Sequence, residues 1–153
     1  MRLLYTLLLY LLIPFVLLRL WWRGRRNPGY RQRAAERFGI YHRPVPEGCI
    51  WIHAVSVGES QATQPLMRWM SENLPDTPVV ISTTTPTGAD RVEQMYRDTV
   101  THVYFPYDLP FAIRRALHAF QPRLIVVMET EIWPNFMHFC TKQGTPVILA
   151  NAR

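Results

Sequence analysis

From residue 49 to residue 153, short apolar runs alternate with segments whose apolar residues recur at helical spacing. The apolar runs occupy residues 49–54, 79–81, 101–105, 124–128 and 147–150. The amphipathic segments lie between them at residues 59–73, 89–98, 110–120 and 134–144. Strands that are apolar at nearly every position are typical of parallel sheets with helices on both faces. The pattern therefore predicts an α/β domain built on a parallel sheet.

Proline positions refine the boundaries of the predicted helices. Pro110 and Pro134 each begin a helical segment, where proline is favoured because its missing N–H is not needed. Pro65 falls inside the segment 59–73 and predicts either a kink or the start of a second helix.

The first 22 residues form a separate apolar segment. Residues 3–18 carry no charge, and Leu20, Trp21 and Trp22 extend the stretch to a length that crosses a bilayer as a helix. A cleaved signal peptide fits poorly, because no small-residue cleavage site follows and the charge lies on the wrong flank. A buried core helix fits poorly as well, because leucines on every side leave no polar face. We therefore predict a membrane anchor over residues 1–22.

Arginines follow this anchor directly. We expect four of them to lie at the membrane surface and contact anionic phospholipid: Arg19, Arg23, Arg25 and Arg26. The positive-inside rule then places the C-terminal side of the anchor in the cytoplasm. Residues 23–48 are predicted to form a basic juxtamembrane helix and linker, with a helix over 30–38 that lies on the membrane and ends at Gly39. The proline-containing connector 43–48 marks the start of a domain over 49–153.

The net charge of +6 belongs to one end of the chain. Residues 1–43 contain nine arginines and one acid, a net charge of +8, whereas the rest of the chain carries −2. A nucleic-acid-binding domain would spread positive charge over a folded face, so we do not expect nucleic acid as a partner. The two cysteines are far apart and typical of buried thiols in a reducing compartment, and the five histidines show no metal-ligand spacing. No metal site is expected.

Polar residues follow three of the predicted strands. Ser56, Gly58 and Glu59 come after the first strand, residues 82–87 after the second, and Glu129 and Glu131 after the fourth. Because the carboxyl ends of parallel strands share one edge of the sheet, these side chains should line one cleft. Hydroxyls, helix-start N–H groups and carboxylates suit a polyhydroxyl or anionic ligand. A dinucleotide is not expected, because Gly58 stands alone without the GxGxxG pattern, and a P-loop is absent.

Glu59 allows two interpretations. A carboxylate in the first turn of a helix is stabilised by the macrodipole, typically by about 0.3–1 kcal/mol, so Glu59 would be a structural cap. A second carboxylate from another loop at the same edge favours chemistry instead, with Glu59 as a general base worth roughly 10²–10⁴ in rate. Ser56 and the threonines of residues 83–87 are, taken alone, more typical of turns than of ligand contacts.

Two stretches resemble the signature motifs of a known family. Residues 53–59 (HAVSVGE) and 128–135 (METEIWPN) are similar to those of the 3-deoxy-D-manno-octulosonic acid (Kdo) transferases. Residues 85–88 (TPTG), 107–110 (YDLP) and 150–153 (ANAR), together with the arginine-flanked anchor, support the similarity. The resemblance covers the whole chain.

This resemblance implies an inner-membrane enzyme of Gram-negative lipopolysaccharide synthesis with the two-domain GT-B fold, whose N-terminal half is a Rossmann-like domain. Such enzymes transfer Kdo from CMP-Kdo to a lipid A precursor, with inversion at the anomeric carbon and without a cofactor or a nucleotide-bound metal. By the family pattern, Glu59 matches the catalytic base and Glu129 a second essential carboxylate. Roles in acceptor binding or support are implied for Ser56, Gly58, Thr84, Thr85, Thr87, Gly88, Glu131 and Asn135.

In this family the donor is bound mainly by a second domain, which these 153 residues do not include. The resemblance therefore implies that the chain holds the acceptor side, and that the isolated chain has negligible transferase activity. Two alternatives stay open at this point. One is a non-catalytic, membrane-tethered α/β module that binds an anionic lipid or a protein partner, and the other is a transferase for a different nucleotide sugar.

Overall fold

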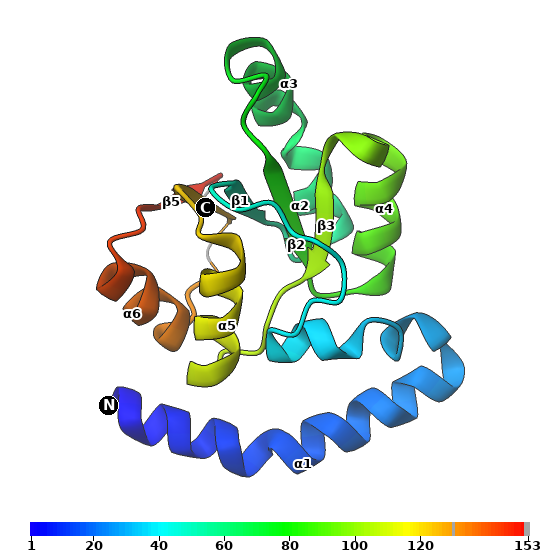
Figure 1. The fold of residues 1–153 in the computed structure, drawn as a ribbon. Coiled ribbons are helices and arrows are strands. Elements are labelled where there is room, and N and C mark those ends of the chain that lie inside the picture. Colours follow the sequence, from blue (N-terminus) through cyan, green and yellow to red (C-terminus); the bar gives the residue numbers. More distant parts are fainter. Residues whose placement is uncertain (130, 152–153) are drawn as a thin grey trace.

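The computed structural model describes residues 1–129 and 131–151, and within them five parallel strands form one sheet (Figure 1). The spatial order is β3-β2-β1-β4-β5, with every neighbouring pair parallel. The strands are β1 Ile50–His53, β2 Val79–Thr83, β3 Thr101–Tyr104, β4 Leu124–Met128 and β5 Val147–Ala150. The predicted α/β class with a parallel sheet is therefore confirmed.

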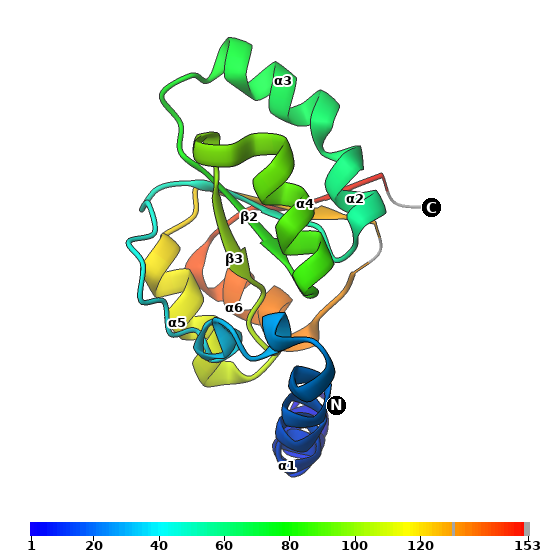
Figure 2. The same cartoon turned by 90° about the vertical axis from the view of Figure 1, so that its right-hand side faces the viewer.

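Helices lie on both faces of this sheet, as Figure 2 shows from the side. They are α2 Val57–Ala62, α3 Gln64–Asn73, α4 Pro86–Tyr96, α5 Pro110–Phe120 and α6 Pro134–Gln143, with a short 3₁₀ helix, η3 Arg97–Thr99, after α4. Helices α5 and α6 cover one face, and α3 and α4 contribute to the core on the other. Every βαβ connection between neighbouring strands thus places a helix over the sheet, which is why the strands read as continuous apolar runs.

Strands β1, β2 and β4 contribute alternate side chains to two hydrophobic cores. Trp51 packs with Phe120 and Phe136 on the α5/α6 face, with its ring centroid 4.8 and 5.3 Å from theirs. Its neighbour Ile52 points to the other face and packs in the cluster that contains Val92 of α4. This alternation follows from the two-residue period of a strand. The strand order places β1 in the middle of the sheet.

Capping residues set two helix boundaries that differ from the predicted ones. Ser56 caps α2, which therefore begins at Val57 and not at Glu59, and Thr85 caps α4, which begins at Pro86. The predicted helix 59–73 is two helices, α2 and α3. Pro65 lies in the first turn of α3, so the prediction that it marks the start of a second helix is confirmed.

Residues 28–38 differ most from the prediction. Instead of one helix on the membrane they form two 3₁₀ helices, η1 Pro28–Tyr30 and η2 Ala34–Phe38, and Arg33 between them has a φ of 56°. Glu36 and Arg37 of η2 are buried against the domain, so this basic segment packs on the protein. Gly39 ends the segment with a φ of 73°, as predicted.

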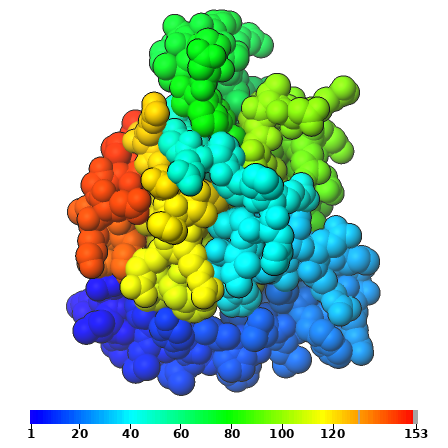
Figure 3. Space-filling model, in the orientation of Figure 1, coloured from blue at the N-terminus to red at the C-terminus, as the bar shows by residue number. Residues whose placement is uncertain are grey.

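Helix α1, Arg2–Arg26, lies along the base of the molecule, beneath η2, α5 and α6 (Figures 1 and 3). It is long and apolar enough to cross a membrane, with a mean hydropathy of 2.2 over its most apolar window. Its N-terminal turns are held by polar contacts: Tyr5 Oη donates to Asp108 Oδ2 at 2.9 Å, and Thr6 Oγ1 donates to Asn135 Oδ1 at 3.0 Å. The opposite face exposes a ridge of large apolar side chains: Leu3, Leu4, Leu7, Leu8, Leu11, Phe15, Leu18 and Trp22.

Candidate active site

The loop between β1 and α2 is closed by a reciprocal cap. The backbone N–H of Glu59 donates to Ser56 Oγ at 3.3 Å, and the Ser56 hydroxyl donates to Glu59 Oε1 at 2.8 Å. The N–H of Val55 donates to Glu59 Oε2 at 2.8 Å, so the carboxylate reaches back over the start of its own helix. Glu59 is therefore part of the structural cap of α2, as the first interpretation predicted. Each of its carboxylate oxygens still has a further acceptor position, and the residue is 8% exposed.

Three carboxylates gather at this edge of the sheet. β1 and β4 are direct neighbours in the sheet, so Glu59, after β1, and Glu129, after β4, follow paired strands. Burial raises the pKa of the Glu131 carboxyl, and the negative charges of Glu59 and Glu129 raise it further. The negative charges of Glu59, from one loop, and Glu129, from another, thus both act on Glu131.

Glu129 has an unusual backbone conformation. Its φ is 60°, in the left-handed region that non-glycine residues adopt rarely, and its N–H donates to the carbonyl of Ala150 at 2.7 Å. The edge strand β5 therefore holds the turn that presents the exposed Glu129 side chain. Backbone strain of this kind persists only where surrounding contacts offset its free-energy cost, and it occurs often at functional sites.

The threonine loop after β2 uses much of its hydrogen bonding internally. Thr84 Oγ1 donates to the carbonyl of Val55 at 3.3 Å and so ties this loop to the loop of Glu59. Thr85 Oγ1 accepts from the N–H of Gly88 at 3.1 Å and from Thr87 Oγ1 at 3.3 Å. A Cβ on Gly88 would lie 3.1 Å from that threonine oxygen, so glycine permits the close approach. Of this loop, the exposed Thr87 and the half-buried Thr84 and Thr85 keep a surface for ligand.

Gly58 and Asn135 occupy different settings. Gly58 is exposed in the first turn of α2, beside Ser56. Asn135 is fully buried and belongs to the joint between α1 and α6: its Nδ2 donates to the carbonyl of Asp108 at 2.7 Å, and its Oδ1 accepts from Thr6. The structure therefore gives Asn135 a positioning role and does not place its side chain with the three carboxylates.

Asp108, which the sequence reasoning did not single out, organises that joint. Its carboxylate accepts from the N–H of Phe136 at 2.7 Å and of Asn135 at 3.0 Å, which caps α6 from another part of the chain. Burial raises the pKa of Asp108, although the hydrogen bonds from Asn135, Tyr5 and Phe136 oppose the rise. Trp133, which precedes α6, makes no capping hydrogen bond with its side chain. A helix start without a local cap needs partners from elsewhere in the chain, and this was the sequence signal that could have pointed to Asp108.

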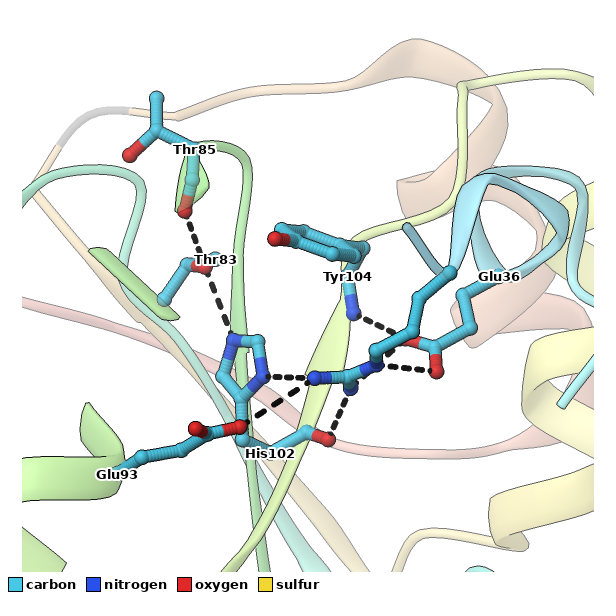
Figure 4. Close-up of polar contacts among 7 residues, drawn as sticks. Glu36, Thr83, Thr85, Glu93, His102 and Tyr104 are labelled. Atoms are coloured by element: carbon cyan, nitrogen blue, oxygen red, sulfur yellow. Dashed lines mark hydrogen bonds and ion pairs between the residues drawn. The ribbon is translucent and has the colours of Figure 1, made fainter. Parts of the chain in front are cut away.

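A second group of polar residues that was not predicted from the sequence joins η2 to the edge strand β3 (Figure 4). Arg33 makes two hydrogen bonds to the Glu36 carboxylate, at 2.7 and 2.9 Å, and also contacts His102 Nδ1 at 3.0 Å. Glu36 Oε2 accepts from the N–H of Tyr104 at 2.8 Å, so a side chain satisfies the open edge of β3. His102 Nε2 contacts Thr83 Oγ1 at 3.0 Å, and Thr83 in turn donates to the carbonyl of Thr85. The signal in the sequence was Glu36, the one acid among nine arginines.

Buried histidines and cysteines serve the core. His53 of the first motif is fully buried, stacks on Phe105 with a centroid distance of 3.9 Å, and has its pKa lowered to about 3 by burial. Cys49 and Cys140 are both buried free thiols, as predicted, and burial raises the pKa of each to about 12. A cavity of about 810 Å³ lies at the amino end of β3, and its lining includes Arg43, His102, Glu36, Glu93 and Asp98 but none of the three edge carboxylates.

Comparison with known proteins decides the family. The family model for 3-deoxy-D-manno-octulosonic-acid transferase (kdotransferase) matches residues 32–153. The chain belongs to the Kdo transferase family. Kdo transferases of Haemophilus influenzae and Bordetella pertussis are 44% and 38% identical to it, over 99% and 97% of the chain. A probable mitochondrial Kdo transferase of Arabidopsis thaliana is 36% identical over 98% of the chain.

The chain spans about a third of the length of these Kdo transferases: 36% of the first two and 34% of the third. The matched part contains both motifs and all three carboxylates of the edge. Within this chain of the Kdo transferase family, the carboxyl edge of the sheet is therefore our candidate active site.

Proposed function

We propose that this chain forms the acceptor side of an inverting glycosyltransferase, which moves Kdo from CMP-Kdo to a lipid A precursor in lipopolysaccharide synthesis. The observation that carries the proposal is the meeting of Glu59, Glu129 and Glu131 at the carboxyl edge of a parallel sheet, in a member of the Kdo transferase family. CMP-Kdo would be held mainly by a second, donor-binding domain, in the GT-B arrangement that the family resemblance implies.

In the proposed mechanism, Glu59 is the general base. An acceptor hydroxyl donates to a free position on its carboxylate, and the carboxylate takes the proton as the sugar oxygen attacks the anomeric carbon of Kdo. The bond from that carbon to CMP breaks on the opposite side, which inverts the configuration and releases CMP with its electron pair. The bonds from Ser56 and Val55 hold the carboxylate in one orientation, so little reorganisation precedes the proton transfer.

Glu129 and Glu131 would support this step. Glu129 is exposed on a strained turn, where its negative charge can stabilise the positive charge that develops on the Kdo ring. Burial and the negative charges of Glu59 and Glu129 raise the pKa of Glu131, which would contact substrate from the same edge. The half-buried Thr84 and Thr85, with Thr87, would contact the acceptor's polar groups.

Membrane attachment would bring the acceptor to this edge. We propose that residues 1–22 anchor the chain in the bacterial inner membrane, through the exposed ridge of α1, with the domain of residues 49–153 on the cytoplasmic face. Arg25 and Arg26 stack on Trp21 and Trp22, 3.9 and 5.0 Å from their ring centroids, which suits side chains at the headgroup level. Confining enzyme and lipid to one surface raises their effective concentration.

The proposal is tested in a chimera, in which this chain replaces the corresponding segment of the Haemophilus influenzae relative. Glu59→Gln retains the shape of the cap and should lower the turnover of CMP-Kdo by at least 100-fold, with an unchanged circular dichroism spectrum. Ser56→Ala is the matched control for capping, because it removes one of the two contacts that orient the carboxylate, whereas the N–H of Val55 still donates to it. If Glu59→Gln lowers turnover no more than Ser56→Ala does, Glu59 is not the base.

The capping contacts of Glu59 favour one alternative, a membrane-tethered module without catalytic activity. That alternative predicts that no Glu59 variant affects turnover by more than its effect on stability. Competition of CMP-Kdo with other activated sugars addresses the remaining alternative, because a transferase for a different sugar would be inhibited more strongly by its own donor.

A further inference from the structure

A cationic pocket of about 250 Å³ lies between the C-terminal half of α1 and the threonine loop. Arg19 and Arg23 of α1 line it on one side, Arg37 of η2 and the residues Thr84 and Thr85 on the other, and Tyr30 of η1 completes the wall. The lining residues include three arginines and no acid. A small pocket with this charge is suited to a multiply charged oxyanion.

Arg37 is the residue whose surroundings indicate that the pocket binds a ligand. It is 4% exposed, its Nη2 donates to the carbonyl of Thr84 at 2.9 Å, and its guanidinium lies 4.4 Å from the centroid of the Tyr104 ring. Its Nε is buried and has no hydrogen-bond partner among the residues that the structure describes. Within residues 1–129 and 131–151, the ion pairs of η2 and its surroundings involve Arg33 with Glu36 and Glu93, and none involves Arg37. A buried guanidinium without a counter-charge is costly, so an anion from outside the chain would complete it.

The backbone around the pocket is packed to hold these arginines in place. A Cβ on Gly29 would lie 3.0 Å from Cβ of Pro86, so η1 sits directly on the first turn of α4. The guanidinium of Arg23 stacks on Tyr30 at 4.7 Å, which directs it toward the pocket. The positive end of the α4 dipole adds to the field of the arginines.

The pocket is joined to the candidate active site by three hydrogen bonds. Arg37 donates to the carbonyl of Thr84, Thr84 Oγ1 donates to the carbonyl of Val55, and the N–H of Val55 donates to Glu59. An anion bound to Arg37 is therefore anchored to the same two loops that position the Glu59 carboxylate.

We propose that this pocket binds a phosphate group on the sugar headgroup of a membrane lipid, and that Arg37 thereby orients the sugar whose hydroxyl faces Glu59. This inference rests on the proposed function, because it assigns the phosphate to the acceptor. The apolar residues Val16 and Leu20 of α1 also line the pocket, so it opens beside the helix that contacts the membrane. Arg37 is a binding and positioning residue in this scheme.

The test is an affinity measurement with the chain in neutral detergent micelles, with fluorescently labelled lipid A as the probe. Dephosphorylated lipid A and phosphatidylglycerol serve as competitors. The unsubstituted chain should bind lipid A at least tenfold more tightly than either competitor, and Arg37→Gln should abolish that preference. Arg25→Gln is the control, because Arg25 is exposed on α1, stacks on Trp21 and does not line the pocket. It should weaken binding to all anionic lipids equally and keep the preference.

A phosphate preference that survives Arg37→Gln would overturn the proposal. Equal competition by phosphatidylglycerol would overturn it as well, because the pocket would then bind any anionic lipid. If Arg37→Gln does not fold, the exposed pair Arg19→Gln/Arg23→Gln gives the same test without a buried substitution. The assay involves no turnover, so it separates the two proposals. If the unsubstituted chain shows no phosphate preference while turnover depends fully on Glu59, the pocket alone is refuted. If the preference is present and requires Arg37 while turnover does not depend on Glu59, the catalytic role alone is refuted.

Discussion

Ser56 and Glu59 are each other's hydrogen-bond partners at the start of α2: the serine hydroxyl donates to the carboxylate, and the N–H of Glu59 donates to the same serine oxygen. One carboxylate thus caps the helix that follows β1 and stands at the edge of the sheet where substrate is expected. A cap and a base are compatible roles, because the fixed geometry that a cap provides is what a base needs.

Removal of the Ser56 hydroxyl should lower the stability of the domain. Ser56→Ala deletes the hydroxyl that serves Glu59 and should lower the free energy of unfolding by about 1 kcal/mol. Urea titration of the purified chain measures this difference. Ser71→Ala is a suitable control, since Ser71 is exposed near the end of α3 and its hydroxyl donates to the carbonyl of Arg68 within the helix. An equal loss in both variants would show that the reciprocal cap adds nothing.

The clustering of carboxylates can be measured directly at Glu131. Its raised pKa should move back toward the ordinary value in Glu59→Gln and in Glu129→Gln, because each substitution removes a negative charge that favours the protonated form. The part of the shift that comes from burial should remain. Side-chain ¹³C NMR titration reports the value, and Glu93→Gln, in a different cluster, should leave it unchanged. No response to either edge substitution would mean that the three acids do not share a site.

His102 predicts a dependence of stability on pH. Burial, with the nearby positive charges of Arg33, Arg43 and Arg37, lowers its pKa to about 3 in the folded chain, against about 6.5 when unfolded. Between these values the unfolded chain binds a proton that the folded chain does not. Stability from this residue is therefore present above pH 6.5 and is lost as the pH falls toward 3, at roughly 1.4 kcal/mol per pH unit.

Urea midpoints at pH 7, 6 and 5 should show this loss, and His102→Gln should make the decline shallower. Glutamine can keep one acceptor for Arg33 and one donor for Thr83, so the variant tests the proton and not the shape. His53 contributes in the same direction in both proteins, because its pKa is lowered as well. Parallel curves for the two proteins would contradict the assignment.

Two glycines with the same backbone conformation should respond differently to alanine. Gly39 and Gly144 have φ values of 73° and 74°, but a Cβ on Gly39 would collide with the carbonyl of Ala112, whereas a Cβ on Gly144 would meet nothing within 4 Å. Gly144→Ala should cost about 1 kcal/mol, the ordinary cost of a left-handed alanine. Gly39→Ala should cost clearly more, because η2 must move off α5. Equal costs in thermal or urea unfolding would show that η2 is not held against α5.

Much of the fold could be predicted from local patterns. The run 124–128 agrees with β4, because a strand buried on both faces must be apolar throughout, and the helix that begins at Pro110 agrees with α5, because a helix start favours proline. The run 147–150 agrees with β5, although Ile148 and Leu149 are exposed there. The sequence also predicted that Glu59 and Glu129 follow strands that end at one edge of the sheet, and β1 and β4 are direct neighbours there. The roles of these carboxylates stay a prediction.

The sequence by itself determined the class of the fold, the order of its elements and the carboxylates at the edge, because these depend on periodicity and on residues close together in the chain. Only the tertiary structure decided the roles of Arg33, Glu36 and Arg37. Arg33 contacts His102, which is 69 residues away, because β3 is an edge strand whose outer backbone groups are not paired with another strand. Nothing in an arginine-rich segment distinguishes a charge that faces lipid from one that is buried, since that depends on which surface the segment packs against.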